Sequence, residues 1–258
     1  MSLRLRWLGH ASAVLDVDGV RLLTDPLLKR HAGLLRRRGD QPLPEHWQGA
    51  DAVLLSHLHH DHAELGSLRQ LGGAPVLTAP ANARWLRGRG IDAAVGLTDV
   101  QWWQVPGSDV RLRLVPAVHG DRPMPHRPNS THGFVVVTES FRVWFAGDTA
   151  PFPAMVDIPA LAGGPIDLAL VPVGGWGPRL SGGHMDAVQA ARACATVGAR
   201  VAVPVHWGTL HAPASRRLPP GWMDRGGPAF AHAAARVAPG LQVHVVAPGE
   251  QIELAPTR

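Results

Sequence analysis

Histidine and aspartate crowd the six residues that follow a short apolar run. Residues 51–55 read as a buried strand, and His57-Leu58-His59-His60-Asp61-His62 comes directly after it. A short loop anchored on a strand can aim alternate side chains at one point, which groups His57 with His59 and Asp61 with His62. Imidazole nitrogen and carboxylate oxygen are natural ligands of zinc and of similar divalent metals. The segment therefore predicts a metal site, and the alternative is a polar surface loop whose histidines cluster by chance.

Three more residues that can bind a metal follow other predicted strands. His119 ends the strand at 112–118, Asp148 follows the strand at 142–146, and His206 ends the strand at 201–205. Loops at strand ends carry functional groups more often than the strands do. Each residue alone also fits an ordinary polar loop position. Together with the four residues of the cluster, they supply enough ligands for two metals.

The order of predicted elements favours a single domain over residues 1–258. Short strands dominate the first 25 residues, helices and strands alternate after the cluster, and 26–50 reads as a long loop with one short helix. Helices are expected at 63–71, 82–89, 152–161, 187–197 and 228–237. Asp186 precedes the clearest helix as its cap, and Gly198 ends it. This pattern predicts two sheets packed face to face with helices outside.

The order of these residues along the chain resembles a known ligand set. His57-x-His59-x-Asp61-His62, followed by His119, Asp148 and His206, is similar to the ligands of the metallo-β-lactamase superfamily. Further segments resemble its branch of ascorbate-6-phosphate lactonase-like and N-acyl-phosphatidylethanolamine phospholipase D-like proteins. They are Trp7–Ser12, Leu22–Pro26, Pro172–Arg179, Gly183–Asp186 and His206–Thr209. The resemblance implies an α/β fold, an αββα sandwich of two mixed β-sheets flanked by helices.

The resemblance also implies roles for the seven residues. His57, His59 and His119 would hold one metal, Asp61, His62 and His206 the second, and Asp148 would bridge them. It implies two divalent ions, with Zn²⁺ fitting the ligand types best and Mn²⁺ or Fe²⁺ tolerated. Such ions lie about 3.5–4 Å apart and generate a shared hydroxide that attacks phosphorus or a carbonyl carbon. Asp61 would also orient this nucleophile or accept its proton.

Several residues near these motifs are candidates for supporting roles. Asp25 and His10 lie in segments that match the family and are expected to hold ligand side chains in place; the alternative is a turn position for each. His184 follows a glycine-rich approach to a helix start, which favours contact with an anionic group and a catalytic role over a purely structural one. Arg179 can pair with a phosphate or carboxylate through two donors.

Two further substrate contacts come from loops beside predicted ligands. The segment 120–132 leaves His119 and contains Arg122, so it is placed to wall the pocket; the alternative is a stiff surface loop. His211 follows His206 by five residues and is a candidate proton donor to a leaving group. The sequence does not decide whether the loops at 26–50 and 120–132 contact substrate, membrane or a partner protein.

These features predict hydrolysis of a phosphoester, phosphodiester or lactone in an anionic small molecule or lipid. A nuclease is the alternative, but the net charge is only +5 and the arginines at 36–38 are not interleaved with aromatics. A non-catalytic metal-binding module is a second alternative, which the complete ligand set disfavours. An iron-dependent oxygen-reducing protein of this fold would usually carry glutamate in place of His59.

Location and assembly are less constrained by the sequence. No apolar run reaches 18 residues, so no transmembrane segment is expected, and a single cysteine, Cys194, permits no internal disulfide. Both observations favour a cytoplasmic protein. Leucines among basic residues in the 26–50 loop allow peripheral membrane contact. The oligomeric state stays open, with a homo-oligomer among the options.

Overall fold

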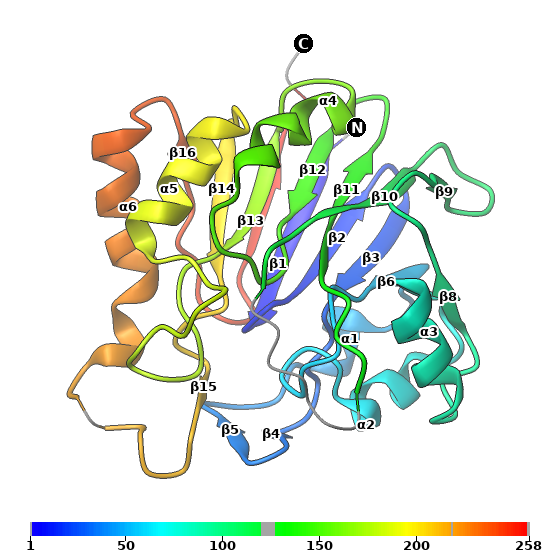
Figure 1. Cartoon of the computed structure of the whole chain (residues 1–258), viewed down its shortest axis with the longest axis horizontal. Coiled ribbons are helices and arrows are strands. Elements are labelled where there is room, and N and C mark those ends of the chain that lie inside the picture. The colour runs from blue at the N-terminus through cyan, green and yellow to red at the C-terminus, as the bar shows by residue number, and fades with distance from the viewer. Residues whose placement is uncertain (1, 120–126, 218, 257–258) are drawn as a thin grey trace.

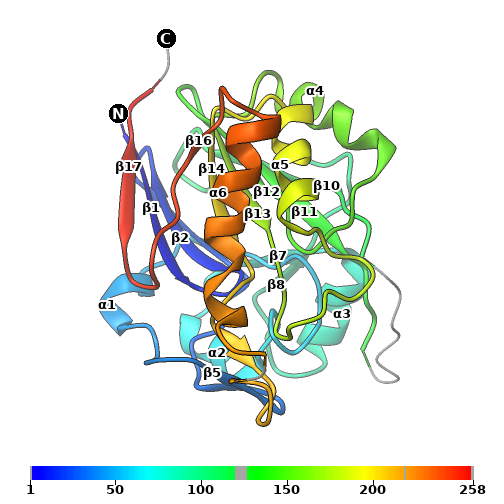
Figure 2. The ribbon, with the colours of Figure 1, turned by 90° about the vertical axis from the view of Figure 1, so that its left-hand side faces the viewer.

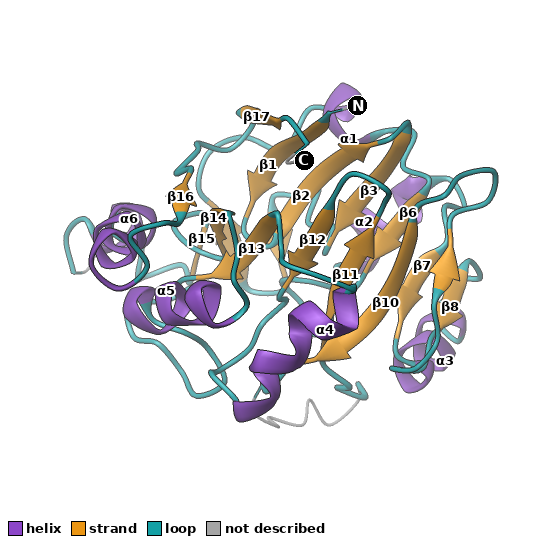
Figure 3. Cartoon of the chain, turned by 90° about the horizontal axis from the view of Figure 1, so that it is seen from above, coloured by secondary structure: helices purple, strands orange, loops and turns teal. Residues whose placement is uncertain are grey.

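Two seven-stranded sheets face each other in the computed structural model, which describes residues 2–119, 127–217 and 219–256 (Figure 3). The first sheet has the order β17-β1-β2-β3-β6-β7-β8, and the second has the order β16-β14-β13-β12-β11-β10-β9. The first sheet contains β1 Leu3–Gly9, β2 Ser12–Val17, β3 Val20–Thr24, β6 Ala52–Leu54, β7 Val76–Thr78, β8 Ala94–Gly96 and β17 Gln251–Leu254. The second contains β9 Trp103–Gln104, β10 Arg111–Pro116, β11 His132–Val137, β12 Arg142–Phe145, β13 Leu168–Pro172, β14 Val201–Val205 and β16 Gln242–Val243.

Helices cover the outer faces of both sheets and complete four layers. They are α1 Pro44–Trp47, α2 Leu65–Leu68, α3 Pro80–Arg87, α4 Ile158–Ala162, α5 Ala187–Thr196 and α6 Gly226–Val237. The helices α5 and α6 lie side by side over the second sheet, and β17 lies beside β1 at the other side of the molecule (Figure 2). This arrangement confirms the predicted αββα sandwich. Among the described residues, no helix is both long enough and apolar enough to span a bilayer.

Alternating side chains build the core between the sheets. Leu3, Leu5 and Trp7 of β1 are buried in the same cluster as Phe134 and Val136 of β11. Since successive strand side chains point to opposite faces, the residues between them serve the outer layers or solvent. Burial of such apolar area contributes roughly 25 cal/mol per Å². This packing holds the two sheets together, and the loops of the site extend from their strands.

Separate apolar clusters fasten the helices to the sheets. Val135 and Trp144 point outward from the second sheet into a cluster with Ala190 of α5 and Phe230 of α6. On the first sheet, apolar side chains of β6 and β7 pack against α3, and Trp47 of α1 packs in another cluster. Both faces of each sheet are thus covered, which explains the nearly continuous apolar runs in β6, β13 and β14.

The local signals in the sequence match the structure where they are strong. Asp18 and Gly19 join β2 to β3 with φ values of 47° and 81°, which is the left-handed conformation of a tight hairpin turn. The carboxylate of Asp186 accepts the Val188 and Gln189 amides, and the Gln189 side chain accepts the Asp186 amide in return. The expected hairpin and the expected helix cap are both confirmed.

Three expected elements differ from the structure. The helix expected at 63–71 is divided into α2 Leu65–Leu68 and a 3₁₀ turn, Arg69–Leu71. The helix expected at 152–161 is divided into a 3₁₀ turn, Pro153–Asp157, and α4, because Pro159 lacks an amide hydrogen and suits the first turn of a new helix. The 26–50 loop contains α1 and also two short strands, β4 His31–Ala32 and β5 Leu35–Arg37. In a three-stranded sheet, β5 pairs with β4 on one side and with β15 Leu210–His211 on the other, and β15 is a distant partner that no local pattern reveals.

Strand direction brings the predicted site residues to one edge. β12, β13 and β14 are parallel, and β10 runs in the same direction because it is antiparallel to β11, which is antiparallel to β12. The loops that follow these strands therefore leave from one end of the second sheet (Figure 1). The loop after β6 leaves the facing sheet toward the same place. His57, His119, Asp148 and His206 follow four of these strands.

Candidate metal centre

Three imidazole nitrogens converge at the first predicted metal position. His59 Nδ1 lies 3.0 Å from His57 Nε2 and 3.0 Å from His119 Nε2. His57 is fully buried, and His119 is nearly so. Three nitrogens at such distances cannot all be satisfied by hydrogen bonds among themselves, since each pair needs one donor and one acceptor. The arrangement fits a cation held by three neutral imidazoles.

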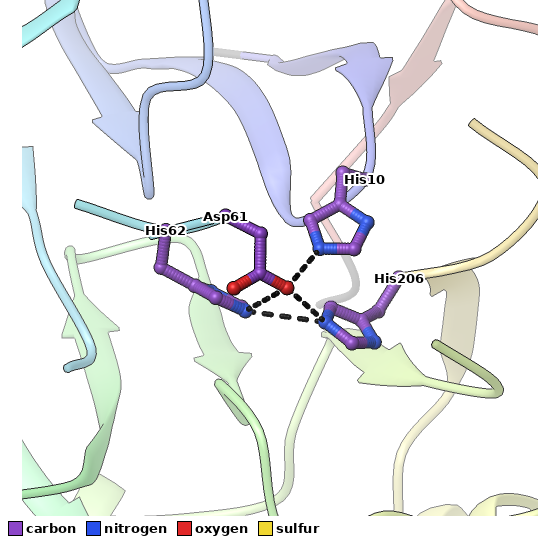
Figure 4. A group of neighbouring side chains, drawn as sticks. All are labelled: His10, Asp61, His62 and His206. Carbon is purple, nitrogen blue, oxygen red and sulfur yellow. Dashed lines mark hydrogen bonds and ion pairs between the residues drawn. The ribbon is translucent and has the colours of Figure 1, made fainter. Parts of the chain in front are cut away.

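A second group gathers around the carboxylate of Asp61. Asp61 Oδ2 lies 3.7 Å from both His62 Nε2 and His206 Nε2, and these two nitrogens are 3.1 Å apart. His10 Nε2 approaches the same carboxylate oxygen at 3.0 Å (Figure 4). The four side chains come from β1–β2, from the loop after β6 and from the end of β14. Their donor atoms are close enough to surround one metal ion.

Asp148 lies between the two groups. Its Oδ2 is 3.2 Å from the Nε2 atoms of His62 and His206, and 3.9 Å from those of His57 and His119. Its Oδ1 is buried and has no hydrogen-bond partner within the described parts of the chain. A buried carboxylate oxygen without a partner is costly unless another ligand takes it up. The donor set therefore fits a metal centre, with Asp148 in contact with both halves.

The outward nitrogens of four histidines are each fixed by a hydrogen bond. His62 Nδ1 donates to Asp25 at 2.7 Å, His119 Nδ1 to the Gly183 carbonyl at 2.9 Å, and His206 Nδ1 to the Gly174 carbonyl at 3.1 Å. His57 Nδ1 lies 2.9 Å from the Ser56 hydroxyl. Each bond places the proton on Nδ1 and leaves the Nε2 lone pair facing the centre.

Asp25 ties two of these histidines to one buried carboxylate. It accepts the Ser56 amide at 2.7 Å and the Ser56 hydroxyl at 2.6 Å, in addition to His62. Because the Ser56 hydroxyl donates to Asp25, its lone pair is free to accept from His57 Nδ1. Asp25 is fully buried. Asp25 thus lies behind the two histidines, in contact with His62 directly and with His57 through Ser56.

His10 supports Asp61 and also the backbone of His206. Its carbonyl accepts the His206 amide at 2.8 Å and the Trp7 indole N–H at 2.9 Å. His10 and His206 have φ values of 55° and 63°, and Asp25 has 31°. These are three of the four non-glycine residues with positive φ in the described chain, where such backbone costs about 1–3 kcal/mol each. Strain is concentrated at this centre.

Burial and neighbouring charges set the protonation of the group. Burial lowers the pKa of His57 well below its usual range and that of His59 to about 4. Burial opposes ionisation of Asp61 and Asp148, but the surrounding histidines outweigh it and hold both pKa values well below normal. Neutral imidazoles beside ionised carboxylates are the forms that bind metals.

His62 differs from the other ligand candidates. Burial lowers its pKa, but the carboxylates Asp148, Asp61 and Asp25 outweigh that effect and raise the pKa well above 6.5. Three anions therefore surround a single imidazole, and in the absence of a metal a proton supplies the compensating positive charge. The site is electrostatically built to hold a cation.

Of the residues predicted to contact substrate, His184 lies at the metal centre, whereas Arg179 is exposed and His211 is buried in a short strand. His184 is brought to the centre: its Nε2 lies 3.3 Å from Asp148 Oδ2, and its Nδ1 is within 3.2 Å of the Ser181 carbonyl. Arg179 is exposed on the loop between β13 and α5. His211 is buried in β15, where its Nδ1 donates to the Ala212 carbonyl. Arg122 lies outside the described residues.

Two side chains at the centre are absent from the sequence-based predictions. Ser56 immediately precedes the cluster and links Asp25 to His57. Asn129 lies 3.2 Å from His59 Nε2. Ser56 could have been identified by its place beside the cluster, where a hydroxyl can contact the next side chain. No periodicity or spacing in the sequence points to Asn129.

Comparisons with known proteins identify the family of the chain. Residues 20–207 match the family model described as β-lactamase superfamily domain. The chain is 29% identical over 262 residues to the UPF0173 metal-dependent hydrolase of Deinococcus radiodurans, an alignment covering 98% of this chain and 100% of that protein. It is 28% identical over 224 residues to N-acyl-phosphatidylethanolamine-hydrolyzing phospholipase D 1 of Caenorhabditis elegans, covering 79% of this chain and 63% of that relative.

A solved structure shows the same fold. Igni18, a metallo hydrolase from Ignicoccus hospitalis, has a TM-score of 0.74 and 23% sequence identity, and the match covers 100% of both chains. The family model spans well over half of the chain and ends at the residue after His206. The chain therefore belongs to the β-lactamase superfamily domain family, and it is a metal-dependent hydrolase with the metallo-β-lactamase fold.

Proposed function

We propose that the protein is a dinuclear hydrolase that cleaves a phosphoester, phosphodiester or lactone in an anionic small molecule or lipid. The observation that carries this proposal is the position of Asp148 Oδ2, within 3.9 Å of nitrogens from both histidine groups. One carboxylate shared by two donor groups suits two neighbouring cations, since each group could hold one ion beside it. Zn²⁺ suits the donors best, and Mn²⁺ or Fe²⁺ are the alternatives.

The seven side chains divide into two sets in this proposal. His57, His59 and His119 form the first, Asp61, His62 and His206 form the second, and Asp148 belongs to both. When bound, two divalent ions supply Lewis acidity and lower the pKa of water toward roughly 7. The protein fixes the donors by outer hydrogen bonds, so little reorganisation is needed during the reaction.

Asp61 and His184 are the proposed proton-handling groups. Asp61 is held by His10 Nε2 at 3.0 Å, so its carboxylate has a fixed direction from which to orient the attacking water and accept its proton. His184 lies in the loop between β13 and α5, and its Nε2 faces Asp148 at the centre. From this position it can donate a proton to the leaving oxygen. Arg179, His211 and Arg122 remain proposed contacts for the anionic part of the substrate.

An exposed leucine supports a lipid or another amphiphile as substrate. Leu34, between β4 and β5, has 86% of its surface exposed, and Lys29, Arg30 and Arg36 lie nearby in the sequence. A Cβ on the neighbouring Gly33 would be 3.7 Å from the His60 ring, so this hairpin lies against the metal loop. The relative that hydrolyses N-acyl-phosphatidylethanolamine supports the phosphodiester class.

The test combines metal content with a substrate panel. Purified protein is loaded with Zn²⁺, Mn²⁺ or Fe²⁺, analysed for metal, and assayed on p-nitrophenyl phosphate, bis(p-nitrophenyl) phosphate, a γ-lactone and a micellar phosphodiester lipid. We expect two metals per chain and turnover of at least one of these substrates. Asp61→Asn and Asp148→Asn should each lower kcat/KM by at least about 100-fold.

A surface variant is the matched control for these substitutions. Asp16→Asn makes the same chemical change on β2, where Asp16 pairs with Arg21 away from the metal centre. It should retain wild-type turnover. One metal per chain would contradict the dinuclear centre, and metal-loaded protein inactive on all four substrates would contradict the proposed reaction. Salt-sensitive cleavage of RNA or DNA alone would favour the nuclease instead.

A further inference from the structure

Asn129 contacts His59 on the side opposite to the other ligand nitrogens. Its amide nitrogen lies 3.2 Å from His59 Nε2. Asn129 Oδ1 is buried without a hydrogen-bond partner within the described residues. On the other side of the same ring, His59 Nδ1 faces His57 Nε2 and His119 Nε2 at 3.0 Å each. The two sides of this imidazole therefore have different partners.

The neighbours of His59 determine which of its nitrogens is protonated. His119 Nδ1 donates to the Gly183 carbonyl, and His57 Nδ1 is hydrogen-bonded to Ser56, so both Nε2 atoms present lone pairs. With a cation among the three rings, His59 Nδ1 must also present a lone pair. The proton of neutral His59 then lies on Nε2, where it needs an acceptor. His59 is the one histidine of the first set that faces the centre through Nδ1.

The amide of Asn129 can supply that acceptor. An amide nitrogen facing an imidazole N–H places two donors against each other, while the unpartnered Oδ1 lacks a donor. A 180° turn of the amide exchanges the two atoms with almost no change of shape, so that Oδ1 faces the Nε2–H of His59 and gains a donor. We propose that Asn129 is a positioning residue whose Oδ1 accepts the Nε2–H of His59, fixing the tautomer that presents Nδ1 to the first metal.

The segment around Asn129 is anchored on both sides. The Ser130 amide donates to Asn82 at 3.3 Å, and the Asn82 side chain donates to the Ser130 carbonyl at 2.7 Å. Arg127 donates to the Leu58 carbonyl at 2.9 Å and to the Ala63 carbonyl at 3.3 Å. Both ends of the metal loop are thus tied to the chain just before β11. The amide is held at a defined place beside His59.

This inference rests on the first metal set of the proposed function, and its test does not use turnover. Wild type, Asn129→Leu, Asn129→Asp and Ser130→Ala are titrated with Zn²⁺ against a chelating indicator. In parallel, ¹⁵N-labelled imidazoles of the Zn²⁺-loaded proteins are examined by NMR for the tautomer of His59. Asn129→Leu keeps similar bulk without an acceptor, Asn129→Asp keeps an acceptor, and Ser130→Ala retains the main-chain bonds to Asn82.

We expect Asn129→Leu to weaken one Zn²⁺ equivalent by about 10–100-fold and to leave the other less affected. Asn129→Asp and Ser130→Ala should bind both equivalents within about threefold of wild type, and His59 in the wild type should carry its proton on Nε2. A His59 proton on Nδ1, or wild-type affinity of Asn129→Leu for both ions, overturns the proposal. A parallel loss in Asn129→Asp would assign Asn129 a merely structural role and also overturn it.

The metal titration and the substrate panel test the two proposals separately, so one proposal can fail while the other stands. If the wild type binds two ions with the expected His59 tautomer but cleaves none of the substrates, the proposed reaction fails while the role of Asn129 stands. If the panel shows turnover but Asn129→Leu binds metal normally, the reaction stands and the role of Asn129 fails. Thermal unfolding of each metal-free variant separates a folding defect from a weakened ligand.

Discussion

At the scale of single residues, the metal centre depends on side chains that touch no metal position. Asp25 accepts three hydrogen bonds, two from Ser56 and one from His62, and it is fully buried. Removing one such carboxylate leaves several buried donors without an acceptor, and each of them loses its solvation without compensation. The centre and the stability of the fold are therefore coupled at this residue.

The Asp25→Ala variant should be both less stable and a weaker metal binder. We expect the free energy of unfolding of the metal-free protein to fall by about 3–5 kcal/mol, since the orphaned donors are buried. Zn²⁺ affinity should fall by about 10–100-fold because His62 loses its orientation. Urea denaturation and chelator competition measure the two effects.

Asp16→Asn is the comparison for this variant. Asp16 forms an ion pair with Arg21 near the surface, and such pairs contribute about 0–1 kcal/mol. Its unfolding free energy and Zn²⁺ affinity should both stay close to wild type. An Asp25→Ala protein that is as stable as Asp16→Asn would show that the Asp25 network contributes little.

At the scale of elements, α5 begins at the end of the loop that delivers His184. Asp186 accepts the Val188 amide at 2.9 Å and the Gln189 amide at 2.8 Å. This pairing fixes where the helix starts, and with it the end of the loop that carries His184. The start of α5 therefore contributes to the position of one proposed proton donor.

Asp186→Ala should lower the free energy of unfolding by about 1 kcal/mol, the usual contribution of an N-cap side chain. Metal stoichiometry should not change, since the Asp186 carboxylate bonds to the Val188 and Gln189 amides of α5 and not to the metal-facing side chains of the described residues. Asp186→Asn restores an oxygen acceptor and should recover most of the stability. Denaturation midpoints of the three proteins measure this, and equal midpoints would contradict a stabilising cap.

The elements also show what the sequence can and cannot predict. The residues His57, His119, Asp148 and His206 could be predicted because each follows an apolar strand, and strand ends meet at one edge. The strands β4 and β5 could not be predicted, because they are short and because β5 pairs with the distant β15, with Leu210 opposite Arg37. Contacts made by loop closure, such as that of Asn129 with His59, leave no periodic signal.

At the scale of the whole molecule, buried histidines make stability depend on pH. The pKa of fully buried His10 is lowered by burial to about 3, and burial also lowers those of His57, His59 and His119. Such groups stay neutral in the folded state while the unfolded chain takes up protons below about pH 6.5. Unfolding therefore becomes more favourable as the pH falls through that value.

The metal-free protein should be less stable at pH 5 than at pH 7. His10 alone accounts for a loss of about 2 kcal/mol over this range. The raised pKa values of His62 and His184 act in the opposite direction, because these side chains bind a proton more tightly in the folded state. The stability that they add as the pH falls is fully present near pH 6.5, so each offsets at most about 1 kcal/mol of the loss. Urea denaturation at the two pH values measures the difference, and equal or higher stability at pH 5 would contradict this account.

Metal removal should destabilise the whole fold. The candidate ligands join loops from both sheets, so ions that bind only the folded state stabilise it by RT ln(1 + [L]/Kd), about 4 kcal/mol at a thousandfold excess over Kd. We expect EDTA to lower Tm by several degrees and added Zn²⁺ to restore it. The Asp61→Asn, Asp148→Asn double variant keeps the histidines but loses both carboxylates, so EDTA should lower its Tm by less than it lowers that of the wild type.

The pairing of β17 with β1 has a consequence for biosynthesis. β1 enters the sheet between β2 and β17, with Leu3 opposite Leu254, so two of the most distant segments of the chain are neighbours (Figure 2). During synthesis, one edge of β1 stays unpaired until β17 has been made. Contacts between such distant segments slow folding, and an open strand edge invites association with other chains. The nascent chain therefore exposes this edge of β1 to association with other chains until β17 emerges.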